Sequence, residues 1–159
     1  MKFEHLVQIN DPLNPLIDPL SRAQLWRGLM RYIEVPTAFV EGLDRGAVVS
    51  RQQNTLQREL HFGRHRVDDE VHLEPQSRIR IDTRASAEMP AGALTLTIEE
   101  HGTELLFVRF LYETFPQGHP PVAAEYQTAM KRAYTAAGID IIQRIRQLAD
   151  EGVLDGPYH

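Results

Sequence analysis

The sequence contains no cysteine, which excludes disulfides, thiolate nucleophiles and cysteine-ligated zinc or iron–sulfur sites. Positive charge is also scarce, because 17 Lys and Arg residues stand against 22 Asp and Glu residues and give a formal net charge of −5. This balance disfavours nonspecific binding to nucleic acid or to an anionic membrane, since both depend on an excess of Lys and Arg. We therefore expect no nucleic-acid partner.

Long apolar runs are absent as well. The longest, such as residues 105–108, are far shorter than the roughly 20 residues that a membrane-spanning helix needs. Residues 1–10 alternate polar with apolar side chains and lack the continuous apolar segment of a secretory signal. With 159 residues, 42% of them apolar and 25% charged, the chain has an ordinary globular composition. These features predict a single cytoplasmic domain over residues 1–159, without a membrane span.

Periodicity supplies the expected elements. Two-residue alternation predicts a strand over residues 1–10 and six more strands in succession between residues 46 and 114. A helix is expected over 21–35, where the first residues fit a capping box, and a second short helix over 36–42. A long amphipathic helix over about 122–148 follows the strands. This order predicts an α+β fold in which a curved, seven-stranded antiparallel sheet wraps around the C-terminal helix and leaves a cavity beside it.

The register of one hairpin can be predicted. If residues 63–64 form a two-residue loop, Leu60 lies opposite Val67 and Leu56 lies opposite Val71. All four apolar side chains then share one face of the sheet, whereas a shift by one residue would set them opposite polar partners. The pairing of apolar side chains therefore favours the first register.

Four polar residues fall on the inner faces of the predicted strands: His5, Arg58, Asp69 and Tyr112. Arg58 can bind a carboxylate, phosphate or enolate oxygen through its planar guanidinium, with Asp69 orienting it. His5 or Asp69 can accept a proton and Tyr112 can donate to a carbonyl, as an aldol-type cyclisation requires. Each also has a structural explanation, because Arg58 and Asp69 can form a buried ion pair and His5 can be a structural histidine. No catalytic residue is assigned.

Large apolar and aromatic residues complete the predicted ligand contacts, although the same residue types also fill cores. They are Trp26, Phe110, Tyr126 and Met130. His61 and His65 do not predict a metal site, because residues four apart across a hairpin turn do not converge as they do on a helix. A Gly-rich phosphate loop and a nucleophile elbow are also absent. We expect neither a metal nor a cofactor.

Four short segments carry a family resemblance, together with the order of the elements. They are Leu25-Trp26-Arg27-Gly28-Leu29, Arg58-Glu59-Leu60, Leu73-Glu74-Pro75 and Thr97-Ile98-Glu99-Glu100. The element order resembles the START-like (SRPBCC) helix-grip superfamily of lipid-transfer domains, polyketide cyclases and plant hormone-binding proteins, and the segments resemble its small AtaL-like members. The resemblance implies the helix-grip fold and a pocket between the sheet and the long helix. AtaL-like members found in fungi are associated with secondary-metabolite clusters.

Three functions remain open from the sequence. The first is binding of a hydrophobic or aromatic small molecule in the central cavity. The second is a cyclase or aromatase that uses the same pocket. The third is a protein-interaction module that uses the outer face of the last strand, where Leu105, Phe107 and Leu111 lie. The same outer face can serve a dimer contact, so the chain is expected to be a monomer or a homodimer.

Overall fold

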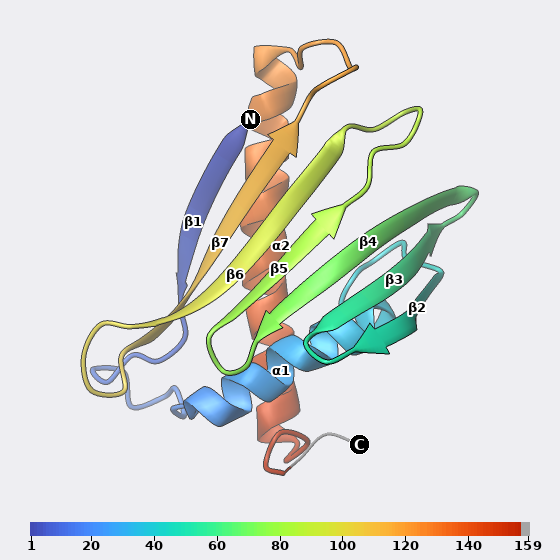
Figure 1. Ribbon diagram of the computed structural model, residues 1–159. Coiled ribbons are helices and arrows are strands. Elements are labelled where there is room, and N and C mark those ends of the chain that lie inside the picture. The colour runs from blue at the N-terminus through green and yellow to red at the C-terminus, as the bar shows by residue number, and fades with distance from the viewer. Residues whose placement is uncertain (157–159) are drawn as a thin grey trace.

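The computed structural model describes residues 1–156, and the last three residues of the predicted domain lie outside this range. Seven strands of the described residues form one antiparallel sheet in the order β1-β7-β6-β5-β4-β3-β2 (Figure 1). The strands are β1 (Lys2–Gln8), β2 (Arg45–Gln52), β3 (Thr55–Phe62), β4 (His65–Glu74), β5 (Arg78–Thr83), β6 (Ala91–Glu100) and β7 (Leu106–Phe115). The sheet curves around the long C-terminal helix, as the sequence predicted.

Three helical segments accompany the sheet: α1 (Arg22–Glu34), the 3₁₀ helix η1 (Pro36–Ala38) and α2 (Ala124–Asp150). The predicted capping box is confirmed, because the Ser21 hydroxyl accepts from the Gln24 N–H at 3.0 Å and the Gln24 side chain accepts from the Ser21 N–H at 2.9 Å. The helix expected over 36–42 is shorter than predicted. Phe39 leaves the helical region with φ −121°, and its ring packs edge-on against that of Tyr32 at 5.6 Å.

The predicted hairpin register is confirmed. Leu60 pairs with Val67, and Leu56 pairs with Val71. Leu56 and Val71 are both fully buried, so a shift by one residue would turn this apolar pair toward solvent. The alternation of side chains therefore sets the register of β3 and β4.

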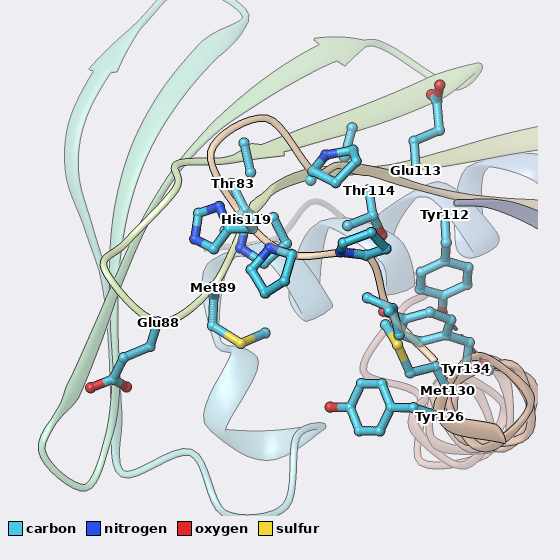
Figure 2. A pocket seen from close by; sticks show the side chains of 18 of the residues that line it. Thr83, Glu88, Met89, Tyr112, Glu113, Thr114, His119, Tyr126, Met130 and Tyr134 are labelled. Carbon is cyan, nitrogen blue, oxygen red and sulfur yellow. Dashed lines mark hydrogen bonds between the residues drawn. The ribbon is translucent and has the colours of Figure 1, made fainter. Parts of the chain in front are cut away.

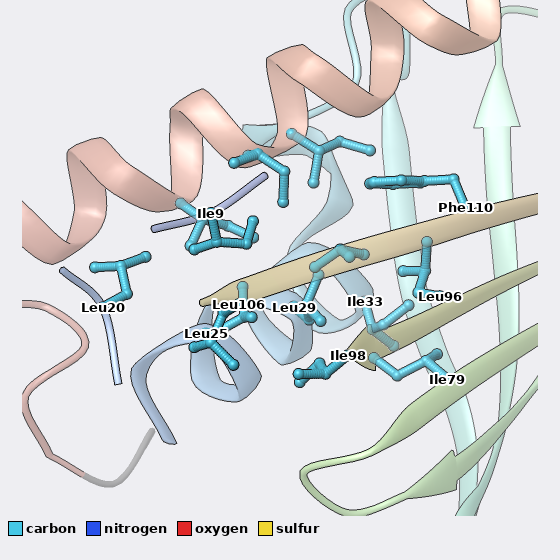
Figure 3. Packing of buried hydrophobic residues seen from close by; sticks show 14 of the residues in the cluster. Ile9, Leu20, Leu25, Leu29, Ile33, Ile79, Leu96, Ile98, Leu106 and Phe110 are labelled. Carbon is cyan, nitrogen blue, oxygen red and sulfur yellow. The ribbon is translucent and has the colours of Figure 1, made fainter. Parts of the chain in front are cut away.

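The core lies where α1 and the C-terminal half of α2 pack on the sheet. Leu25, Leu29 and Ile33 of α1 are fully buried, and Figure 3 shows them between the helices and the strands. Gly28 allows α1 to approach α2 closely, because a Cβ at this position would overlap the side chain of Ile145. The two helices therefore lock together at one end of the molecule.

The two halves of α2 have different surroundings. The buried residues of this helix, Gly138, Ile141, Ile142, Ile145 and Leu148, all lie in its C-terminal half. In the N-terminal half, Tyr126 is 58% exposed and Met130 is half-buried, although both lie on the apolar stripe of the amphipathic helix predicted over about 122–148. The first half of the stripe thus faces open space instead of a packed core. No helix within residues 1–156 has the length and apolar character to cross a membrane.

Candidate functional site

Two adjoining cavities lie between the sheet and the helices. Cavity A, of about 600 Å³, lies among the ends of β6 and β7, the loop 116–123 and the first half of α2 (Figure 2). Cavity B, of about 680 Å³, lies between the inner face of β3–β5 and the α1–η1 segment. They share the lining residues Thr83, Glu88, Met89, Pro90, Leu94 and Tyr134. Each volume falls within the roughly 300–1,000 Å³ that is usual for small-molecule sites.

Arg58 and Asp69 border cavity B and bind each other. Nε and Nη2 of Arg58 donate to the two carboxylate oxygens of Asp69 at 2.8 and 2.6 Å. Nη1 donates to the backbone carbonyl of Ile33, at the end of α1, at 2.9 Å. The exposed fractions of Arg58 and Asp69 are only 5% and 2%. Because every guanidinium nitrogen and both carboxylate oxygens already have a partner, this pair joins α1 to the sheet.

Tyr32 supplies a free polar group beside that pair. It lies on α1 next to Ile33 and lines cavity B. Burial raises the pKa of the Tyr32 phenol, and the nearby Arg58 charge acts in the opposite direction. The phenol therefore stays protonated near neutral pH and can donate a hydrogen bond. Within the described residues its hydroxyl has no hydrogen-bond partner, so the donor is available to a molecule in the cavity.

Two more tyrosines lie where the cavities meet. The rings of Tyr112 on β7 and Tyr134 on α2 stack at 4.0 Å. The Tyr112 hydroxyl reaches the backbone carbonyl of Tyr134 only at 3.5 Å, the limit of a hydrogen bond. Burial raises the pKa of both phenols, so both remain protonated donors near neutral pH. Together with Tyr32, they give an apolar space a small number of neutral hydroxyl groups.

The residues predicted from the sequence fall into three places. Tyr112, Tyr126 and Met130 line cavity A, and Arg58 and Asp69 line cavity B. The remaining three, His5, Phe110 and Trp26, line neither cavity.

His5 and Phe110 instead lie beneath α2. Their rings stack at 5.0 Å, and the His5 ring lies so close to Gly138 that a Cβ there would come within 2.8 Å of its Nε2 atom. This Nε2 is buried and has no hydrogen-bond partner. Burial lowers the pKa of His5, and a hydrogen bond with the backbone of Tyr134 opposes the shift. Trp26 is half-buried on α1 and packs against the core.

Tyr32, Tyr134 and Met89 are absent from the ligand contacts predicted from the sequence, yet each lines a cavity. Tyr134 had a usable signal, because it follows Met130 by four residues and so shares its helix face. Tyr32 and Met89 had none, since one flanks an apolar stripe and the other lies in a loop.

The three histidines near the β3–β4 hairpin do not converge. His61 lies 2.9 Å from Glu59, and His72 lies 3.0 Å from Glu70. His65 contacts Glu88 in the loop between β5 and β6 at 3.0 Å. Each imidazole therefore has a separate carboxylate partner.

Comparisons with known proteins agree with the observed fold. The chain resembles the Zhui aromatase/cyclase from Streptomyces sp. R1128, with a TM-score of 0.68 and 10% identity over 96% of this chain and 95% of that chain. It also resembles the di-domain aromatase/cyclase StfQ of the steffimycin pathway, with a TM-score of 0.69 and 11% identity over 96% of this chain. The match spans about half of StfQ, 51% of its length.

A third similar structure is Ara h 8.0201, with a TM-score of 0.61 and 10% identity over 91% of this chain and 97% of that chain. At these identities the structural matches show the fold alone. No curated protein sequence matches the chain. Residues 7–152, however, match the family model described as "AtaL: Acetylaranotin biosynthesis cluster protein L". This chain is therefore a member of the AtaL family, with the START-like helix-grip fold.

Proposed function

We propose that this protein binds an apolar or aromatic small molecule, lipid-like or polyketide-like, in the two adjoining cavities. One observation carries the proposal: a large apolar space borders the protonated hydroxyl of half-buried Tyr32, which has no hydrogen-bond partner among the described residues. Apolar walls with a few placed polar groups are the usual composition of a small-molecule site. The proposal places the protein in the cytoplasm, with which the cysteine-free sequence is compatible.

Tyr32 is the polar anchor in this proposal. Arg58 and Asp69 satisfy each other, so they offer a ligand little beyond their packing surface. A phenol O–H, in contrast, can donate to a carbonyl or hydroxyl oxygen of an apolar ligand without burying a new charge. We therefore expect a neutral ligand oxygen next to Tyr32.

A thermal-shift screen tests the proposal with aromatic, polyketide-like and fatty-acid compounds. A ligand at 100 times its dissociation constant adds about 2.7 kcal/mol to the free energy of unfolding. For a protein of this size, that corresponds to a rise in Tm of roughly 5–11 °C. If no compound in these three classes raises the Tm of the wild type, the proposal is wrong.

The Tyr32→Phe variant then tests the anchor. It removes only the hydroxyl, and the loss of one neutral hydrogen bond, about 0.5–1.5 kcal/mol, lowers affinity roughly 2- to 13-fold. Tyr126→Phe is the matched control, because Tyr126 also lines a cavity but is 58% exposed. Equal affinities of wild type and Tyr32→Phe would remove Tyr32 from the site and leave binding in the cavities intact.

A second candidate function is a cyclase or aromatase that uses the same space. The fold similarity to aromatase/cyclases supports it, and so does the presence of three neutral phenols at the cavity walls. A phenol O–H can donate to the carbonyl oxygen that gains negative charge when a new carbon–carbon bond forms. Turnover of a candidate polyketide that is lost in Tyr32→Phe or Tyr112→Phe, with the fold intact, would distinguish this function from passive binding.

The third possibility, a protein-interaction module, has less support from the outer face of β7. Phe107 and Leu111 of this strand, and Leu105 just before it, are all half-buried. The Phe107 ring stacks on His101 at 4.5 Å, and Arg109 between them binds Glu99. The apolar side chains are thus separated by charged groups instead of forming one patch.

A further inference from the structure

The loop of residues 84–90, between β5 and β6, crosses the space where the two cavities meet. Three of its residues border both cavities, and two residues of β6 and α2 border both as well. These five are Glu88, Met89, Pro90, Leu94 and Tyr134. In Figure 2, Met89 lies across cavity A from Tyr126 and Met130. The cavities are therefore two lobes of one groove, and the loop lies over their junction.

The tip of this loop is a compact turn. The Ser86 N–H donates to the carbonyl of Met89 at 2.9 Å. The Ser86 hydroxyl accepts from the N–H groups of Glu88 and Met89 at 3.3 and 3.1 Å. With its own hydrogen bonds formed internally, the tip can move as one unit.

Two contacts from neighbouring loops hold the tip in place, as far as the described residues show. Nδ1 of His65, in the β3–β4 hairpin, lies 3.0 Å from the Glu88 carboxylate, and these side chains are 67% and 66% exposed. Nε2 of His119, in the β7–α2 loop, lies 3.2 Å from the carbonyl of Ser86. No residue from 84 to 89 is buried. The Arg84 N–H donates to the Asp68 carbonyl at 3.0 Å and holds the base of the loop to β4. Exposed polar contacts contribute little stability, so the tip beyond this base opens at low cost.

Met89 is the apolar group that the loop offers to the groove. It is 59% exposed although it lines both cavities, so much of its side chain has no packing partner. A ligand that extends from one lobe into the other would pass Met89 and bury this surface. A compact ligand in one lobe would leave the junction unfilled.

We propose that residues 84–90 form a strap, a loop that lifts to admit one elongated apolar ligand and then closes over the middle of the ligand through Met89. The contacts with His65 and His119 hold the strap closed. This inference rests on the proposed function, and it adds the shape of the ligand and the residue that selects for length. A molecule that reaches both lobes can enter and leave only when the strap is lifted. A molecule small enough for one lobe can exchange with the strap closed.

A cross-linking experiment tests the strap. The natural chain has no cysteine, so His65→Cys combined with Glu88→Cys introduces two unique thiols that a short bis-maleimide can join. Stopped-flow fluorescence then follows the association and dissociation of cis-parinaric acid, a long probe, and of N-phenyl-1-naphthylamine, a compact one. We expect the cross-link to slow both rates of the long probe about tenfold or more and those of the compact probe about threefold or less.

Two controls accompany it. The same double variant, capped with N-ethylmaleimide, is the reference for the cross-linked protein. Because it has lost the contact between His65 and Glu88, it should exchange the long probe no more slowly than the wild type. Glu74→Cys with Arg78→Cys replaces an exposed ion pair of 3.3 Å at the β4–β5 turn, where neither residue lines a cavity, and its cross-link should change neither probe. His119→Ala removes the contact with the Ser86 carbonyl that helps to hold the strap closed, and it should speed release of the long probe roughly two- to fivefold.

The outcomes separate this inference from the proposed function. Unchanged kinetics of cis-parinaric acid in the cross-linked protein, with its affinity retained, would overturn the strap but not ligand binding. Equal slowing of both probes would mean that the loop controls entry for ligands of any length. That result would overturn the inference that the strap acts on elongated ligands in one continuous groove. Failure of either probe to bind the wild type, together with a negative thermal-shift screen, would overturn both proposals.

Discussion

Removal of Asp69 should destabilise the protein strongly. Asp69→Ala leaves the guanidinium of Arg58 unpaired at a position that is only 5% exposed. An uncompensated buried charge costs about 3–5 kcal/mol, a large part of the roughly 5–15 kcal/mol that stabilises a typical domain. With about 2–4 °C of Tm for each kcal/mol in a chain of this size, the expected loss is roughly 6–20 °C.

The double variant Arg58→Met/Asp69→Leu distinguishes the effect of removing both charges from the effect of leaving one of them unpaired. It removes both charges and keeps apolar bulk, so it should be clearly more stable than Asp69→Ala. The remaining cost includes about 1 kcal/mol for the Ile33 carbonyl, which loses its donor. As a control, Glu34→Ala breaks the 2.7 Å contact with Arg51, whose side chain is 48% exposed. That change should cost less than about 1 kcal/mol.

Urea unfolding, followed by the fluorescence of the single tryptophan, Trp26, measures the stability of the wild type and of each variant. The reasoning predicts that the effects of Arg58→Met and Asp69→Leu, each measured alone, sum to more than the effect of the double variant. It would be refuted by additive effects, or by an Asp69→Ala protein that unfolds at the same urea concentration as the wild type. Either result would mean that the two charges are not dependent on each other.

Two further predictions concern the contact between His5 and Gly138. Burial lowers the pKa of His5 in the folded protein, so the unfolded chain binds the proton more readily. The free energy of unfolding should therefore fall as the pH drops below about 6.5, and it should continue to fall until the pH passes the lowered pKa of the folded state. The His5→Leu variant should lack this part of the pH dependence. Measurements of Tm from pH 7.5 to 5 check this, and curves of Tm against pH that run parallel for the wild type and the variant would contradict it. Gly138→Ala places a Cβ 2.7 Å from His5 Cε1. The overlap should cost about 1–3 kcal/mol, which a helix-propensity gain of about 1 kcal/mol offsets only in part. In a His5→Ala background, Gly138→Ala should stabilise the protein. Calorimetry that shows Gly138→Ala to stabilise the protein in the wild-type background as well would disprove the close contact.

Local patterns in the sequence were enough to predict most of the fold. Alternation favoured the register that pairs Leu56 with Val71, because a shift by one residue exposes apolar side chains. The capping box at Ser21 set the start of α1, since its hydrogen bonds involve only neighbouring residues. The opposition of Arg58 and Asp69 followed from the same register. Each of these features depends on residues that are near in sequence or adjacent across one hairpin.

The site depended on contacts that no local pattern encodes. Arg58 faces the inside by alternation, but only the crossing of α1 over the sheet brings the Ile33 carbonyl to it and makes the pair structural. The same crossing turns Tyr32 into cavity B, although periodicity marked it only as a neighbour of an apolar stripe. Met89 reaches the groove because its loop folds back over the sheet. The sequence alone therefore determined the elements, the register of the β3–β4 hairpin and the inward-facing residues. The tertiary structure decided which of those residues bind each other and which remain free for a ligand. That outcome depends on the packing angle of a helix and the path of a loop, which no local pattern encodes.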